Sequence, residues 1–488
     1  MNIKRAKEEI INTVRAYLQK DDSGNYMIQP VKQRPILLIG PPGIGKTAIM
    51  EQAARQCEIA LVSYTMTHHT RQSAMGLPFI SRKTYAGEEH SVTEYTMSEI
   101  IASVYDKMES TGLKEGILFI DEINCVSETL APVMLQFLQG KSFGNTKVPE
   151  GWIIVSAGNP PEYNRSVREF DVVTLDRVKT INVEADYGVW REYAREQAVH
   201  GAITAYLDSR SENFYKIETT VDGKNFVTAR GWEDLSELLY AYERLGIRPD
   251  KDTIVQYLCD AEISVDFANY LELYYVYEKA YNMNEVLLGN AGDKVKSRLT
   301  DASFDEKVSV VSLLISRLNR SFRKCMVLEL SVDLVFEALK DFKKRAKTDN
   351  TALVGVWSEI IQARNNEYLK STEAGFYSPD EKNAVKKGIS ILENMSVTLA
   401  QSGERDADKA FEIVRADFIK LKETLEDAVN TTSGELENAF AFMDEVFGDS
   451  PQMVLFTTEL AAGRYSLRFI EENGCEEFYK HNKGLILV

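Results

Sequence analysis

The chain has 488 residues, which is too long for one compact core, so roughly two to four domains are expected. With 44% hydrophobic and 27% charged residues, its composition is that of an ordinary folded protein, which excludes a disordered or fibrous one. The net charge of −17 makes nucleic acid an unlikely partner, because such a surface repels polyanions on average.

The first twenty residues predict an amphipathic helix and not a signal peptide, because Ile10, Ile11, Val14 and Leu18 recur at helical spacing. No later segment offers the run of about eighteen apolar residues that a membrane span needs. The five cysteines are scattered without a CxxC pair, a pattern typical of neither a disulfide framework nor a zinc site. We therefore expect a cytoplasmic protein without a membrane span.

Between Pro35 and Val183, short apolar runs alternate with helical stretches. Continuous apolar runs separated by helices indicate strands that are buried on both faces of a parallel α/β sheet. The five runs are residues 36–39, 59–64, 116–121, 152–159 and 178–183.

The first run leads into GPPGIGKT at 40–47, which is followed by the helical sequence AIMEQAARQ. A strand, a glycine-rich loop and a helix in this order are typical of a phosphate-binding loop. Lys46 would contact the β- and γ-phosphates of ATP, and the hydroxyl of Thr47 would bind Mg²⁺. The predicted nucleotide-binding residues are Gly40, Pro41, Pro42, Gly43, Ile44, Gly45, Lys46, Thr47 and Ala48.

The third run continues into ILFIDEIN at 117–124, a buried strand that ends in two carboxylates. We expect Asp121 to hold Mg²⁺ through water and Glu122 to orient and activate the attacking water. Acidic residues at a helix N-terminus are a common alternative. The phosphate-binding loop upstream favours the catalytic interpretation.

Five motifs in this order resemble the motif string of MoxR-type AAA+ ATPases, and the resemblance covers about residues 30–280. It implies a Mg²⁺-dependent ATPase that forms a ring, a hexamer in this family, and remodels or activates a protein partner in a chaperone-like manner. The implied partner is a protein with a von Willebrand factor A domain. The motifs are GPPGIGKT, LFIDEIN, SAGNP at 156–160, LDRV at 175–178 and TARGWEDL at 228–235.

The same resemblance implies three further catalytic residues. Asn159 is similar to the sensor 1 residue, Arg177 to the arginine finger that completes a neighbouring subunit's site, and Arg230 to the sensor 2 residue of the lid. Arg165 and Arg168 are alternatives to Arg177 as the residue that acts in trans. From the residues alone, the alternative for Asn159 is a turn residue, and the alternative for the arginines is a solvated surface charge.

Residues 68–97 form a long segment within the α/β part, and such segments are usually functional. The resemblance places an insertion that lines the pore of the ring here, with residues 76–79 in it, and a second hairpin at 140–151. His68 and His69 are adjacent, which is unsuitable for two metal ligands on one helix face, so no metal site is expected there.

After residue 186 no strand pattern returns, and helical periodicities predominate. The expected fold class is α/β, an AAA+ P-loop parallel sheet core with an all-helical lid and an all-α C-terminal domain. We predict a nucleotide-binding core over 1–186, a lid over 187–285 and a partner-binding domain over 286–488. The apolar stripe of residues 406–430 is expected to be core.

Two other functions compete with this interpretation. A nucleic-acid-directed ATPase, such as a loader, helicase or restriction motor, would need basic residues on its pore loops. A scaffold with incidental turnover need not retain both Asp121 and Glu122, so it is disfavoured. The basic candidates are Arg71, Arg82, Lys83, Lys141 and Lys147.

Overall fold

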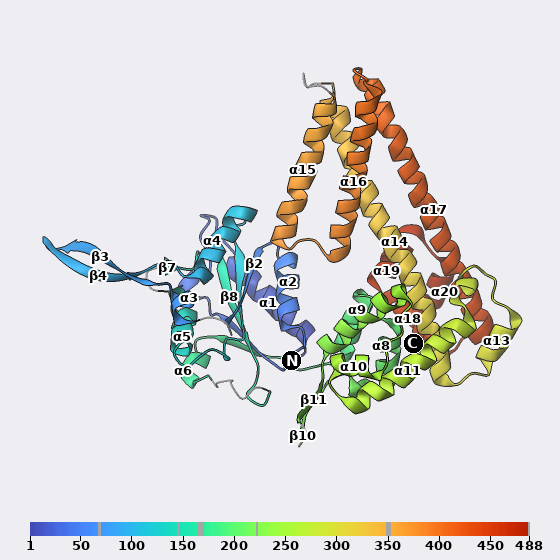
Figure 1. The fold of residues 1–488 in the computed structure, drawn as a ribbon, viewed down its shortest axis with the longest axis horizontal. Coiled ribbons are helices and arrows are strands. Elements are labelled where there is room, and N and C mark those ends of the chain that lie inside the picture. The colour runs from blue at the N-terminus through green and yellow to red at the C-terminus, as the bar shows by residue number, and fades with distance from the viewer. Residues whose placement is uncertain (67–69, 144–145, 164–169, 221–222, 348–352, 487–488) are drawn as a thin grey trace. The chain divides into compact units, whose positions relative to one another are not determined.

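A computed structural model describes most of the chain, and the protein divides into two compact units (Figure 1). The first unit comprises residues 1–186 with 369–376, and the second comprises 187–368 and 377–488. The further division of the second unit at residue 285 stays a prediction. The described residues are 1–66, 70–143, 146–163, 170–220, 223–347 and 353–486.

A five-stranded parallel sheet forms the centre of the first unit, with the strand order β2-β5-β8-β1-β9 (Figure 1). Strands β5 and β8 lie inside the sheet and are almost entirely buried, as continuous apolar runs predict. All five predicted strands, and the predicted fold class, are confirmed. The strands are β1 (Ile36–Ile39), β2 (Ala60–Thr65), β5 (Gly116–Asp121), β8 (Trp152–Gly158) and β9 (Lys179–Asn182).

Most helices of the first unit bury an apolar face against this sheet. In the first of them, Asn2 caps the N-terminus by accepting a hydrogen bond from the amide of Arg5, and Ile10, Ile11 and Val14 are buried, as their spacing predicts. The helices are α1 (Ile3–Leu18), α2 (Lys46–Gln56), α3 (Arg71–Met75), α4 (Glu99–Thr111), α5 (Ala131–Gly140) and α6 (Val172–Leu175), with a 3₁₀ turn at Pro30–Lys32.

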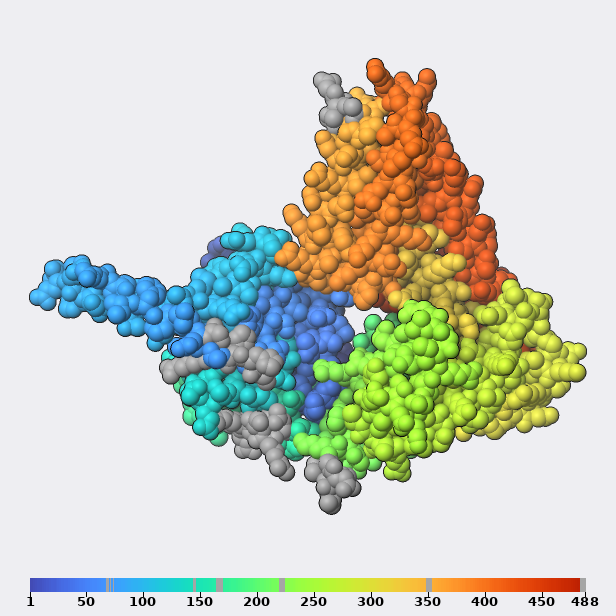
Figure 2. Space-filling model, viewed as in Figure 1, coloured from blue at the N-terminus to red at the C-terminus, as the bar shows by residue number. Residues whose placement is uncertain are grey.

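Two antiparallel hairpins lie where the sequence predicts them. The longer one, β3 (Pro78–Tyr85) with β4 (Glu88–Tyr95), stands clear of the α/β core (Figure 2). Its side chains are exposed on both faces, and Ile80 is 77% exposed. The shorter hairpin is formed by β6 (Ser142–Phe143) and β7 (Thr146–Lys147). His68 and His69 lie outside the described residues.

The second unit is mostly helical, but the prediction that no strand follows residue 186 is wrong. Strands β10 (Lys216–Thr220) and β11 (Gly223–Val227) form an antiparallel hairpin, and their short, polar sequences carry no apolar run. A 3₁₀ turn at Ser211–Asn213 precedes them. The helices are α7 (Tyr187–Glu196), α8 (Gly201–Ser209), α9 (Ala229–Leu245), α10 (Lys251–Leu258), α11 (Ala261–Tyr281), α12 (Met283–Leu287), α13 (Asp293–Thr300), α14 (Phe304–Arg345), α15 (Leu353–Ala374), α16 (Pro379–Ser402), α17 (Ala407–Phe447), α18 (Pro451–Ala462), α19 (Arg464–Asn473) and α20 (Glu476–Ile486).

The long helix α14 is the common support of the second unit, because α8, α11, α16, α17, α18 and α19 all pack against it. Near its C-terminal end it shares an apolar core with Trp357, which is fully buried and donates a hydrogen bond to the carbonyl of Leu392 at 3.0 Å. Val414 is buried in the same core, and Phe411 and Phe418 pack against it. The first half of the apolar stripe of α17 is therefore core, as expected, whereas Leu425 and Val429 are half-buried and lie outside this core.

Candidate active site

The glycine-rich loop connects β1 to α2 at the edge of the sheet where the parallel strands end. Gly43 and Gly45 adopt φ angles of +72° and +88°, which favour glycine, and α2 begins at Lys46. A Cβ on Gly40 would lie 2.8 Å from the carbonyl oxygen of Val183, so only glycine fits there. The first amides of α2 have no partner within the helix, so the loop lies at the positive end of the helix.

Lys46 lies inside this loop and is only 8% exposed. Its ammonium donates to the carbonyls of Gly40 and Pro41, each at 2.8 Å, and to Oδ1 of Asn159 at 2.9 Å. A buried ammonium needs such oxygen partners to offset its lost hydration. Lys46 thus joins the loop after β1 to the residue that follows β8.

Thr47 and Asp121 meet across the same edge, where the hydroxyl of Thr47 donates to Oδ2 of Asp121 at 2.9 Å. The other carboxylate oxygen accepts the amide of Glu122 at 2.9 Å, and Glu122 has a φ angle of +56°. A left-handed conformation at a non-glycine residue is strained and is common at functional sites. One hydroxyl and one carboxylate side by side are the hard oxygen ligands that suit Mg²⁺.

The sequence did not point to Asn124, which holds the ends of two strands together. It is 5% exposed, its Nδ2 donates to the carbonyl of Asn159 at 2.8 Å, and its Oδ1 accepts the amide of Asn159 at 3.3 Å. Asn124 fixes the backbone of a residue that contacts Lys46, so it is a positioning residue. Its place just beyond the two carboxylates is the only signal that the sequence offers.

The predicted arginines lie apart from this cluster. Arg177 follows α6, is exposed, and donates to the side chain of Gln139 at the end of α5. Arg230 is the second residue of α9 in the second unit, is exposed, and lies next to the Gly231 amide that the Thr228 side chain caps at 3.2 Å. The alternatives Arg165 and Arg168 lie outside the described residues.

Several basic residues proposed for pore loops have acidic or backbone partners. Lys83 forms an ion pair with Glu94 across the β3–β4 hairpin, and Arg82 lies 3.7 Å from a carboxylate oxygen of Glu89. Lys141 donates to a backbone carbonyl at 2.7 Å, and burial lowers the pKa of its ammonium to about 8. These three residues do not form a free basic surface for nucleic acid.

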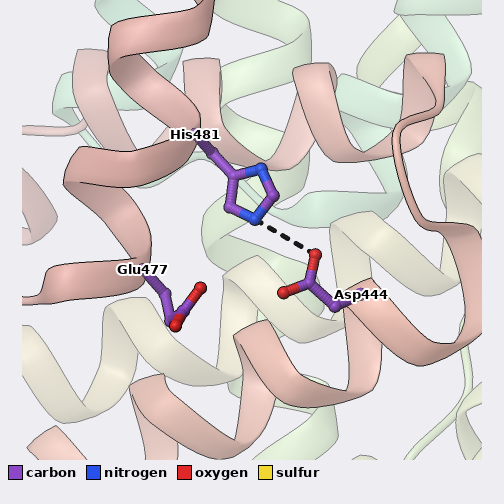
Figure 3. Close-up of side chains that lie close together, drawn as sticks. All are labelled: Asp444, Glu477 and His481. Carbon is purple, nitrogen blue, oxygen red and sulfur yellow. Dashed lines mark ion pairs between the residues drawn. The ribbon is translucent and has the colours of Figure 1, made fainter.

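A second group of possible metal ligands, Asp444, Glu477 and His481, lies between α17 and α20, with ligand atoms within 4.8 Å of one another (Figure 3). Nε2 of His481 lies 3.1 Å from Oδ1 of Asp444, and Glu477 lies 3.1 Å from the ammonium of Lys480. The imidazole ring also stacks on the ring of Phe440, with the two ring centroids 6.0 Å apart. These contacts are typical of packing between two helices, and Nε2 of His481 makes no hydrogen bond among the described residues.

Comparison with known proteins agrees with the geometry of the first unit. Residues 36–173 match the family described as ATPase family associated with various cellular activities (AAA). No curated protein matches the chain. A crystal structure of a candidate ATPase from Cytophaga hutchinsonii ATCC 33406 is 15% identical, with a TM-score of 0.25, over 40% of this chain and 50% of that one. This chain therefore spans about half of that protein.

The family match supports ATP binding and hydrolysis by the first unit. Across the described residues, no helix combines the length and the apolar character that crossing a membrane requires.

Proposed function

We propose, from the match of residues 36–173 to an AAA ATPase family, that this chain binds ATP with Mg²⁺ around Lys46 and hydrolyses it. The observation that carries the proposal is the convergence of three chemical groups from three strand ends. The ammonium of Lys46, the paired oxygens of Thr47 and Asp121, and the amide of Asn159 all lie at one edge of the sheet.

Each group has a distinct task in this proposal. The amides of residues 40–48 and the ammonium of Lys46 bind the phosphates. Thr47 would bind Mg²⁺ directly and Asp121 through water, and the bound ion would neutralise charge on the phosphates. Glu122 accepts a proton from the attacking water as it orients it. Asn159 would contact the γ-phosphate or the attacking water, because its side chain already accepts a hydrogen bond from Lys46.

The remaining arginines act between subunits and in the lid. We assign Arg177 to the site of a neighbouring subunit in a hexameric ring, since an exposed guanidinium can stabilise charge on phosphate oxygens. Arg230 would contact the γ-phosphate from the start of α9. Both side chains are exposed, so each is accessible to a phosphate group outside its immediate surroundings.

The ring would act on a protein client in the manner of MoxR-type ATPases, with a von Willebrand factor A protein as its partner. The net charge of −17 and the engaged basic residues of the hairpins support a protein client over nucleic acid. A nucleic-acid motor would instead bind with a salt slope of about −0.9 per neutralised phosphate.

Two substitutions separate binding from hydrolysis. Lys46→Ala should abolish binding of a fluorescent ATP analogue, because it removes the ammonium that would bind the phosphates. Glu122→Gln should retain binding and lose turnover, because the carboxamide keeps the shape but not the base. The matched controls are Lys147→Ala and Glu109→Gln, which change exposed residues of the same types in the same unit. Turnover by Glu122→Gln at the wild-type rate would remove Glu122 from the mechanism.

The ring and its client need a second experiment. ATP turnover per subunit should rise with protein concentration, and Arg177→Ala should lose turnover while it keeps ATP affinity within a few fold. A flat turnover number with a monomer in sizing experiments would contradict the ring. Stimulation by DNA or RNA with a steep salt slope, and none by a von Willebrand factor A protein, would favour the nucleic-acid motor.

A further inference from the structure

A large cavity lies entirely within the second unit, remote in sequence from the ATPase motifs of the first. Its volume is about 1010 Å³, and its walls come from α9, α11, α14 and the first residues of α16 and α19. Pockets that hold small ligands typically have volumes of about 300–1,000 Å³. The cavity is therefore large enough for a ligand with several charged groups.

The charge of the cavity is opposite to that of the chain. Seven cationic side chains line it against four carboxylates, whereas the chain as a whole carries a net charge of −17. Six of the seven cations are arginines. Three of these, Arg317, Arg320 and Arg323, follow one another at three-residue spacing on α14, which places them along one side of the helix. Such a local excess of positive charge attracts anions.

The cations on α14 are already neutralised within the protein. Arg317 pairs with Glu278, Arg320 pairs with Glu243 at 2.9 Å, and Arg323 pairs with Asp380. These pairs fix the arginines in place and cancel most of the negative charge of the walls. Any net attraction for an anion must therefore come from the other cations.

Of the four other cations, Arg464 at the start of α19 lies 3.6 Å from a carboxylate oxygen of Glu381, and the remaining three lie on the wall formed by α9, the loop after it, and α11. Among the residues that the structure describes, Arg244, Arg248 and Lys279 pair with no carboxylate, and all three are exposed. The guanidinium carbon of Arg248 lies 5.0 Å from the centroid of the Tyr275 ring. This stacking contact does not use the N–H groups of the guanidinium, which point outward around its rim. Three uncompensated cations therefore share one wall.

Tyr275 supplies an independent observation on the same wall. Its side chain is buried, with 7% exposed, yet its hydroxyl makes no hydrogen bond among the described residues. Burial raises the pKa of this hydroxyl, so it stays protonated and is a hydrogen-bond donor. A buried donor without a partner is rare in folded proteins and calls for a specific explanation.

We propose that this cavity binds a small ligand that carries several phosphates, with Arg244, Arg248 and Lys279 as its recognition groups. Guanidinium groups bind phosphate oxygens with two parallel hydrogen bonds, which suits a wall dominated by arginine. Tyr275 would donate a hydrogen bond to the same ligand. This site is separate from the proposed ATPase site and does not depend on it.

The test measures binding of inorganic tripolyphosphate to the full chain by calorimetry, in a Lys46→Ala background that weakens the phosphate-binding loop. We expect binding at one site per chain. The double substitution Arg248→Gln with Lys279→Gln should weaken it at least about tenfold, as expected when two charge-assisted hydrogen bonds are lost. The matched control, Lys251→Gln with Lys294→Gln, removes two exposed lysines that do not line the cavity and should leave affinity within about twofold.

Further binding measurements distinguish the classes of ligand that could carry these phosphates. ATP binding more tightly than tripolyphosphate in the same background would assign the site to a nucleotide, and the reverse order would assign it to inorganic polyphosphate. Absence of tripolyphosphate binding, or equal binding by the cavity variant and the control, would overturn the proposal. Tighter binding of hexaglutamate that is lost in the cavity variant would also overturn it, in favour of an acidic peptide. Failure of Lys46→Ala to affect ATP hydrolysis would count against the proposed function alone.

Discussion

Replacement of Gly158 by alanine should disturb the end of β8 and with it the candidate active site. A Cβ at this position would lie 2.5 Å from Oδ1 and 2.8 Å from Cγ of Asn124. Asn124 is buried and is held by two hydrogen bonds to the backbone of Asn159, so it cannot move aside without breaking them. Overpacking costs about 1–3 kcal/mol and each of the two lost hydrogen bonds about 1 kcal/mol, so we expect a loss of about 3–5 kcal/mol.

The same substitution should also lower turnover. Asn159 contacts the ammonium of Lys46 at 2.9 Å, so a shift of its backbone moves a group that the proposed mechanism uses. A misplacement of about 1 Å can cost about 100-fold in rate. Urea denaturation gives the stability, and steady-state ATP hydrolysis gives kcat and KM, of which kcat should change more.

Gly434→Ala is the matched control, because a Cβ there would meet nothing within 4 Å and the residue lies inside α17. Alanine is favoured over glycine in a helix by up to about 1 kcal/mol, so this variant should be as stable as the wild type or more stable. If Gly158→Ala were as stable and as active as Gly434→Ala, the tight packing of Asn124 against β8 would be refuted.

Three further predictions concern stability, each measured by urea denaturation. Arg191→Met should cost about 1.5–3 kcal/mol, because it removes the two-bond partner of Asp208 and one of the two arginines that pair with the buried carboxylate of Glu459, and a cost below about 0.5 kcal/mol would contradict this. Lys141→Met should stabilise the protein by about 1–2 kcal/mol at pH 7, after allowance for partial exposure. The folded-state pKa of about 8 is below the unfolded value of about 10.4, so this advantage should fade as pH rises from about 8 to 10; a constant difference would oppose the assignment. Trp357→Phe should cost about 2 kcal/mol, since it removes a buried hydrogen bond and leaves a smaller ring in a packed core, and a neutral effect would show that this hydrogen bond contributes nothing.

The strands of the sheet could be predicted because each strand is marked by its own short stretch of sequence. The segments ILLI and GILFID are continuous apolar runs of strand length, and burial on both faces of a parallel sheet requires such runs. The phosphate-binding loop is equally local, since its glycines, lysine and threonine act through their spacing along one turn. The hairpin of β10 and β11 was missed because five-residue polar strands such as KIETT resemble loops.

The position of Asn124 could not be predicted from the sequence, because it depends on the register between two strands. Strand β5 pairs with β8 so that Ile120 lies opposite Ser156, and the amide of Ile123 then reaches the carbonyl of Ala157 at 3.0 Å. This register places Asn124 beside Asn159. A single sequence gives the order of the strands along the chain but not their alignment in the sheet.

The length of helix α14 determines how far a movement at one of its contacts is carried within the second unit. Its 42 residues make a rod of about 60 Å at 1.5 Å per residue. Ser312 and Ser316, in its first third, lie beside Gly201 of α8, whereas Phe342, near its far end, packs on Trp357 of α15. If the helix moves as a rigid rod, a tilt of about 5° at the contact with α8 would displace Phe342, about 40 Å further along the helix, by about 4 Å. Small rearrangements near α8 are thereby amplified where α15 begins.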